Sequence, residues 1–293
     1  MSNREIIYRT FGQDSGFITR LVSPSDLGQY LKPFVFLDLF CADIAMARKM
    51  LNGGGMPLHP HSGIATITVV TDGYLRFSDP ESGTGKIEYG GVEWMLAGGG
   101  VWHGKEMIPD HNSGFTGFQL WIALPPHLEN SAPQSRYIES KDMLRVGPAH
   151  VILGDYQNVK SPVPSPLGIN YLLVTLKKNQ TWRYNPPKGH SVAWMALSKG
   201  KVKILGDSCV DTGEMVMFNN DEEGIDIQSL SEEAVFVLGS AIPHEETLHL
   251  GSYSVHTSAE ALVAGEKRII ELRNKIRSSK EMNTEIGTVP IFR

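Results

Sequence analysis

Two series of short apolar segments, separated by glycine-containing turns, run through most of this 293-residue chain. Their β-branched and aromatic side chains are typical of strands. Because the strands are many, short and closely spaced, they favour an all-β sandwich or barrel over alternating strands and helices. The first series comprises residues 34–40, 65–70, 86–89, 92–96 and 117–124, and the second comprises residues 169–176, 181–184, 191–197, 201–205, 214–218 and 233–239.

The two series resemble each other in the order of their parts. Residues 65–77 are typical of a hairpin with a turn at Gly73, and residues 191–204 of a hairpin with a turn at Gly200. A further glycine and a further strand follow in both series. Such repetition predicts two copies of one fold, although two hairpins can also look alike by chance.

We therefore expect two domains joined by an irregular, proline-rich connection. The N-terminal domain is expected at residues 1–135, the connection at 136–167 and the C-terminal domain at 168–293.

The C-terminal domain is expected to end in an amphipathic helix at residues 257–278. Thr257 and Glu260 have the spacing of a capping box, in which side chains bond to the free N–H groups at a helix start. One apolar helical face follows them, formed by Leu262, Ile269, Leu272 and Ile276.

The charge balance excludes one class of function. The chain has 27 Lys and Arg residues against 32 Asp and Glu, a formal net charge of -5, so it lacks the basic surface of a typical nucleic-acid-binding protein. Cys41 and Cys209 are too few for a disulfide framework or a cysteine-rich zinc site. The first residues do not resemble a secretory signal, and no apolar run reaches about 18 residues. We expect a cytoplasmic protein with no direct nucleic-acid or membrane partner.

A histidine pair begins one of the predicted strands. His59 and His61 alternate, so both side chains project to one face, and Pro60 between them suits the entry to a strand. The pair either starts a metal site or consists of two surface or hydrogen-bonded histidines.

A second segment favours the metal site. Three consecutive glycines, 98–100, allow a sharp turn directly before His103 and Glu106. Together with the histidine pair, these residues would supply three imidazoles and one carboxylate, a set that suits iron, manganese, copper or nickel. In an octahedral ion such a set leaves two positions open for water, dioxygen or substrate.

The combined motif resembles the pirin family of the cupin superfamily over nearly the whole chain. The resemblance rests on HPH at 59–61, Asp72-Gly73, GTGK at 83–86, GSYSVHTSAE at 251–260, and a run comprising Gly91, Trp94-Met95, Ala97-Gly98, Gly100 and His103. It implies a bicupin, with two jelly-roll-like β-sandwich or barrel domains. It also implies one divalent transition metal per chain in the N-terminal domain, usually iron, with manganese, nickel, copper or zinc as alternatives.

The ligands implied by this resemblance are His59, His61, His103 and a glutamate. The family places its glutamate two residues after the third histidine, where this chain has Lys105, and Glu106 stands one residue later. A spacing of three requires a bulge or turn, which Gly104 could supply. We expect Glu106 to be the fourth ligand, and a site of three histidines is the alternative.

Two functions follow from the resemblance. The first is a quercetin 2,3-dioxygenase-like oxidoreductase that acts on a flavonol or another enolisable aromatic substrate, with Glu106 as metal ligand and catalytic base. The alternative is a non-catalytic, iron-containing, redox-responsive protein that docks on a transcription regulator or a metabolic enzyme. The expected partner is accordingly a small aromatic substrate or a regulatory protein, and the sequence leaves the oligomeric state open.

The C-terminal domain is expected to hold no metal. Aligning the two series by their glycines replaces the four candidate ligands with residues that bind metals poorly or not at all: Pro186, Lys188, Ile225 and Gln228. His190 is the one histidine near this region, and one imidazole does not make a site. We therefore expect about one ion per chain.

Overall fold

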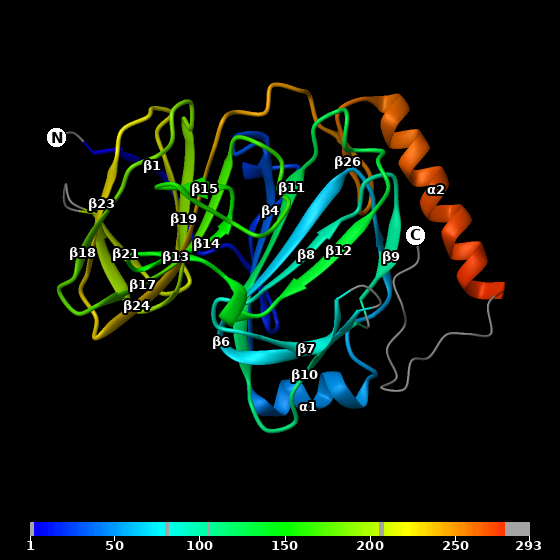
Figure 1. The fold of residues 1–293 in the computed structure, drawn as a ribbon, viewed down its shortest axis with the longest axis horizontal. Coiled ribbons are helices and arrows are strands. Elements are labelled where there is room, and N and C mark those ends of the chain that lie inside the picture. Colours follow the sequence, from blue (N-terminus) through cyan, green and yellow to red (C-terminus); the bar gives the residue numbers. More distant parts are fainter. Residues whose placement is uncertain (1–2, 80–81, 105, 205–207, 279–293) are drawn as a thin grey trace. The chain divides into compact units, whose positions relative to one another are not determined.

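The computed structural model describes residues 3–79, 82–104, 106–204 and 208–278 (Figure 1). Lys105 lies outside the described part. So do Leu205, the last residue of the strand predicted at 201–205, and residues 279–293 of the predicted C-terminal domain. The all-β fold with a C-terminal helix, predicted from the sequence, is confirmed. The chain divides into two compact units: unit 1 consists of residues 1–21 and 142–244, and unit 2 of residues 22–141 and 245–293.

Unit 2 is built on an antiparallel sheet that carries the first series of strands. Its order is β12 (Gln134–Ile138), β8 (Val92–Leu96), β6 (Ile64–Asp79), β11 (Phe115–Ala123) and β4 (Phe34–Ala42). The far half of β6 pairs with β7 (Gly83–Glu88) and β10 (Met107–Pro109). Smaller elements complete the unit: η1 (Leu27–Gln29), α1 (Ile44–Asn52), a pair of β5 (His59–His61) with β9 (Val101–His103), and a pair of β25 (His249–Leu250) with β26 (Val255–His256).

Unit 1 carries the second series in two sheets. The larger has the order β1 (Ile6–Thr10), β22 (Met215–Phe218), β19 (Val192–Lys199), β24 (Glu233–Ala241), β17 (Ile169–Lys177), β14 (Ala149–Leu153) and β13 (Arg145–Val146). The smaller has the order β18 (Thr181–Tyr184), β23 (Ile225–Ser229), β20 (Lys201–Ile204) and β21 (Ser208–Asp211). Between them lies an apolar core that includes Val174, Met195, Phe218 and Phe236, all fully buried. Three short pieces lie outside these two sheets: the hairpin of β2 (Gln13–Ser15) and β3 (Ile18–Val22), the pair β15 (Asp155–Tyr156) with β16 (Val159–Lys160), and η2 (Ser140–Asp142).

The internal repeat is visible in the strand order. The order of neighbouring strands β8-β6-β11-β4 in the sheet of unit 2 corresponds to the order β22-β19-β24-β17 in the larger sheet of unit 1. In each unit one further strand from outside both series pairs with the β8 or β22 edge: β12, which precedes the second series, pairs with β8, and β1, which precedes the first series, pairs with β22. The compact units therefore do not follow the sequential division into residues 1–135, 136–167 and 168–293.

The hairpins predicted at Gly73 and Gly200 do not form. Strand β6 runs without interruption through Gly73, and the strands on either side of Gly200 pair with different sheets. Both glycines have positive φ, +71° and +83°, and both let a neighbouring strand approach closely. A Cβ at Gly73 would lie 2.1 Å from the Gly114 carbonyl oxygen, and one at Gly200 would lie 2.4 Å from that of Glu233. The two glycines therefore mark the same place in the repeat, where the strand leaves one sheet for another.

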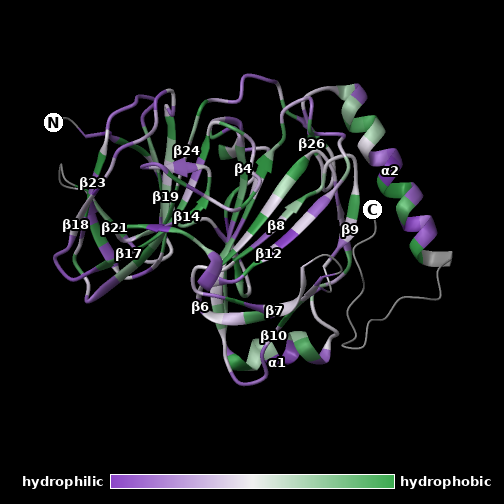
Figure 2. Cartoon of the chain, in the orientation of Figure 1, coloured by the Kyte–Doolittle hydropathy of each residue, from purple (hydrophilic) through white to green (hydrophobic). Residues whose placement is uncertain are grey.

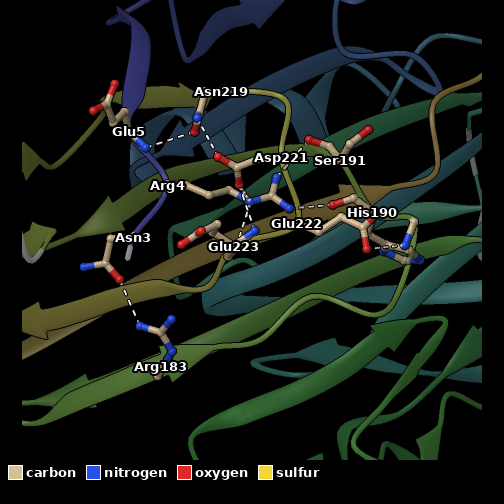
Figure 3. Close-up of polar contacts among 11 residues, drawn as sticks. Asn3, Arg4, Glu5, Arg183, His190, Ser191, Asn219, Asp221, Glu222 and Glu223 are labelled. Atoms are coloured by element: carbon tan, nitrogen blue, oxygen red, sulfur yellow. Dashed lines mark hydrogen bonds and ion pairs between the residues drawn. The ribbon is translucent and has the colours of Figure 1, made fainter. Parts of the chain in front are cut away.

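Arg4 holds the N-terminal segment in place within unit 1 through hydrogen bonds and an ion pair (Figure 3). Its buried guanidinium donates to the carbonyl oxygens of Ser191 (2.9 Å), Glu223 (2.9 Å) and His190, and it pairs with Asp221 at 3.3 Å. Charge-assisted hydrogen bonds of this kind are stronger than neutral ones. They hold β1 in position to pair with β22.

The C-terminal helix α2 (Ala259–Ser278) contacts β9 and β26 in unit 2. Its hydrophobic and hydrophilic residues alternate along its length (Figure 2), and Ile269, Leu272 and Ile276 are buried as predicted. The predicted cap is wrong. Ser258 caps the helix, because its hydroxyl accepts the Ala261 N–H at 3.1 Å, while the Thr257 hydroxyl donates to Glu129 at 2.6 Å. Over the described residues, neither α-helix combines the length and apolarity needed to cross a membrane.

Candidate metal centre

Three histidines converge where β5 pairs with β9 in unit 2. The antiparallel register places His59 opposite His103, and His61 lies on the same face of β5 as His59. Ring centroids are 4.6 Å apart for His59 and His103, 4.8 Å for His59 and His61, and 5.1 Å for His61 and His103. Potential ligand atoms of all three lie within 4.8 Å of one another, the one such group found in the described parts of the chain. The alternation of HPH and the turn after the glycine run thus produce a three-sided set of imidazoles.

Each imidazole is oriented through its Nδ1 atom. Nδ1 of His59 lies 2.8 Å from the Pro57 carbonyl oxygen, and Nδ1 of His61 lies 3.3 Å from that of Tyr253. Nδ1 of His103 lies 2.7 Å from Oε1 of Glu106. Carbonyl and carboxylate oxygens only accept, so we assign the hydrogen of each ring to Nδ1 and leave Nε2 for a ligand bond.

The free nitrogens fit a metal ion. Nε2 of His103 is buried and has no hydrogen-bond partner, an arrangement that is costly unless another group binds there. Metal-bound histidines commonly donate their second N–H to a carbonyl or carboxylate oxygen, as these three do. Imidazole ligands suit zinc, copper, iron and nickel.

Glu106 is placed behind His103. Its side chain is 1% exposed, Oε1 accepts from His103, and Oε2 accepts from the Gly104 N–H at 2.7 Å. Gly104 has φ +139°, and a Cβ there would lie 2.4 Å from the Pro57 carbonyl oxygen, so the turn between the two residues depends on this glycine. The structure therefore brings together three of the four expected ligands. The ligand role of Glu106 stays a prediction, and it would require the carboxylate to exchange its present bonds.

The pKa values of the cluster separate into two groups. Burial, with His103 nearby, lowers the pKa of His59 to about 4 and lowers the pKa of His61 well below its usual value. Burial also acts to lower the pKa of His103, but the charge and hydrogen bond of Glu106 outweigh it and raise that pKa. The pKa of Glu106 is lowered, because His103 and Gly104 outweigh the effect of its burial. His59 and His61 are therefore neutral at neutral pH, and a metal would compete with a proton for His103.

Aromatic side chains flank the cluster. The Trp121 ring lies edge-on to His61 at 4.9 Å and stacks on Phe36 at 4.0 Å. Trp102, opposite Pro60 in the register, donates from its indole N–H to the Ile269 carbonyl oxygen of α2 at 2.9 Å. The surroundings of the three histidines are therefore largely apolar on these sides, which strengthens electrostatic interactions there.

The C-terminal segment supports the site in a way that sequence reasoning missed. The Ser62 hydroxyl donates to Ser254 at 2.8 Å and lies 3.0 Å from Nε2 of His256. Nδ1 of His256 lies 3.0 Å from Glu129. Ser62 follows His61 in the chain, and the Tyr253 carbonyl oxygen lies 3.3 Å from the His61 ring, so this buried chain of polar contacts fixes one of the candidate ligands from behind. No local sequence motif indicates these contacts, because Ser62 and Ser254 are 192 positions apart in sequence.

The corresponding positions of unit 1 hold different groups. Ile225 is fully buried in the apolar core, and Gln228 lies on the same strand, β23. Nδ1 of His190 lies 2.8 Å from the Ser240 hydroxyl, which also contacts the Tyr184 hydroxyl at 2.6 Å. The expectation of about one ion per chain stays a prediction.

Comparison with known proteins places these features in a family context. Residues 17–122 match the family model of pirin. Pirin-1 of Arabidopsis thaliana is 29% identical over 238 residues, which cover 78% of this chain and 79% of that protein. The predicted resemblance to the pirin family is confirmed.

Solved structures agree with the fold. A quercetin 2,3-dioxygenase from Acinetobacter baumannii has a TM-score of 0.77 at 22% identity, covering 94% of this chain and 98% of that one. The bacterial pirin YhhW from Escherichia coli, in complex with nickel(II), has a TM-score of 0.57 at 17% identity, covering 82% of this chain and 98% of that one. These likenesses confirm the predicted cupin-type fold.

Proposed function

From the pirin match and the three-histidine cluster, we propose that this chain is a metal-dependent dioxygenase acting on a flavonol or another enolisable aromatic compound. One observation carries the proposal. Potential ligand nitrogens of three imidazoles lie within 4.8 Å of one another in unit 2, while the Nδ1 atoms of the same rings face oxygen acceptors. The name of the similar Acinetobacter baumannii structure supports the substrate class.

The chain's own residues would hold one divalent metal through His59, His61 and His103. A redox-active ion, when bound, supplies Lewis acidity toward an enolisable oxygen and a route for dioxygen chemistry. Three protein ligands leave further positions for exogenous groups, as in catalytic rather than structural sites. Glu106 keeps the His103 ring in place and offsets part of the positive charge.

We propose iron as the resident metal, with nickel as the first alternative because the similar YhhW structure holds nickel(II). Manganese and copper also suit the donor set. Zinc alone would weaken the oxygenase proposal, because zinc has no redox chemistry.

The proposal is tested by oxygen uptake. Protein purified without added metal is analysed for its elements and then reloaded separately with iron, nickel, copper and manganese. We expect uptake of dioxygen with quercetin for at least one ion, and its loss in His59→Ala protein. Stoichiometric metal binding without uptake on any flavonol would contradict the dioxygenase and favour the redox-responsive binding protein.

A further inference from the structure

A buried carboxylate other than that of Glu106 lies on the sheet β12-β8-β6-β11-β4 of unit 2, and it belongs to Glu93. Register places Thr68 of β6 opposite Glu93 of β8 and opposite Gln119 of β11. The Thr68 hydroxyl lies 2.7 Å from Oε2 of Glu93 and 2.8 Å from the Gln119 side chain. Glu93 is 1% exposed, so a polar row crosses three neighbouring strands inside the unit.

This row shares a face of the sheet with the histidine cluster. Gln119 and Trp121 are two residues apart on β11, so their side chains project to the same side. Trp121 contacts His61 at 4.9 Å. His103 and Glu106 are near enough to Glu93 to act on it electrostatically. Glu93 and the three imidazoles therefore face one region of unit 2.

One oxygen of Glu93 is unsatisfied. Oε1 is buried without a hydrogen-bond partner, as is the Thr66 hydroxyl oxygen, which register places on the same face. Burying a carboxylate oxygen without a hydrogen-bond partner costs more free energy than burying an unpaired neutral oxygen, and native proteins contain few such atoms. Its position near the cluster indicates that a ligand group with a proton to donate binds there.

The charges around Glu93 suit proton transfer near neutral pH. Burial raises the pKa of Glu93 to about 7, with His103 acting to lower it and Glu106 acting to raise it. Burial raises the pKa of Tyr137, opposite Glu93 on β12, so Tyr137 stays protonated. Asp38 of β4 lies one strand beyond, opposite Gln119. Glu106, by contrast, has both oxygens engaged, one by His103 and the other by the Gly104 N–H.

We propose that Glu93, rather than Glu106, is the base that takes the proton from the substrate hydroxyl. The proposal rests on the proposed function of the same site. In this step the O–H bond of an aromatic or enolic hydroxyl breaks, and the proton forms an O–H bond with Oε1 of Glu93. The electron pair stays on the substrate oxygen, whose negative charge then faces the three histidines and the cation they would hold. Proton acceptance requires no oxidant.

The test counts the protons released when catechol binds to zinc-loaded protein, by calorimetry in buffers of different ionisation enthalpy. Zinc prevents turnover, and catechol is un-ionised at about pH 8. Wild-type protein should release about one proton per catechol fewer than Glu93→Gln protein, because ionised Glu93 takes up the hydroxyl proton and the amide cannot accept it. A hydroxide displaced from the zinc takes up the same number of protons in both proteins, so it does not change this difference. Glu88→Gln, which alters an exposed carboxylate on β7, should behave as wild type.

A second measurement follows the same difference with pH. Once acid protonates Glu93, it can no longer take up the hydroxyl proton, so the proton release of wild-type and Glu93→Gln protein should converge as the pH falls. Equal proton release by the two proteins at about pH 8, with catechol bound by both, would overturn the role of Glu93 alone. Absence of catechol binding by wild-type protein that holds its metal would overturn the substrate class, and the base with it.

Discussion

At the scale of single residues, the site depends on which nitrogen of each ring is already used. Oxygens of Pro57, Tyr253 and Glu106 lie within hydrogen-bond distance of the three Nδ1 atoms, which leaves the Nε2 atoms for a ligand bond. HPH alternation predicts that two imidazoles share a face, and the structure bears this out. The sequence could not predict the role of Glu106, because a spacing of three residues leaves open which way the turn at Gly104 directs the carboxylate.

This difference gives a prediction for two variants. His103→Ala removes one of three ligand nitrogens, so metal affinity should fall by more than about 100-fold, whereas Glu106→Gln removes only an orienting carboxylate and should cost about 10- to 100-fold. Competition with a chelator of known affinity measures both. Equal losses in the two variants would show instead that Glu106 is itself a ligand.

At the scale of elements, local patterns predict strands better than they predict partners. The short apolar segments at residues 92–96 and 117–124 lie in strands β8 and β11, much as expected. The predicted series include neither β1 nor β12, and no local pattern indicates that β1 pairs with β22 or β12 with β8, because strand pairing depends on backbone contacts between distant residues. Thr257 is a second example. Its spacing from Glu260 predicts a helix cap, but its hydroxyl donates instead to Glu129, which is distant in sequence.

Glu129 offers a prediction about the C-terminal segment. Its buried carboxylate accepts from the Thr257 N–H at 2.7 Å, from the Thr257 hydroxyl and from His256. Glu129→Gln should destabilise unit 2 by about 1–3 kcal/mol, because buried donors lose a charged acceptor. Amide hydrogen exchange should then quicken at residues 253–258. Glu271→Gln, on an exposed position of α2, serves as the control, and equal exchange in both variants would contradict this role.

At the scale of the whole molecule, buried histidines predict how stability changes with acid. Burial lowers the pKa of His190 to about 4 and that of His150 to about 4. An unfolded histidine titrates near about 6.5, so the folded state binds these protons less readily than the unfolded state. The contribution of each histidine to stability is therefore complete above about pH 6.5 and is lost as the pH falls toward 4.

The free energy of unfolding should fall by about 3 kcal/mol for each of these two histidines as the pH falls from about 6.5 to 4. Urea unfolding of unit 1, followed across this pH range, measures it. His190→Gln should flatten the pH dependence, because glutamine does not titrate. A slope that is the same in the variant and the wild type would contradict the assignment to His190.

The central claim is that one of the two repeats holds a metal and that His59, His61 and His103 hold it. Elemental analysis of protein reloaded anaerobically with iron(II) and dialysed to remove excess ion tests this most directly. The account predicts about one ion per chain in the wild type and almost none in His103→Ala protein. Two ions per chain, or unchanged occupancy after the loss of His103, would contradict it.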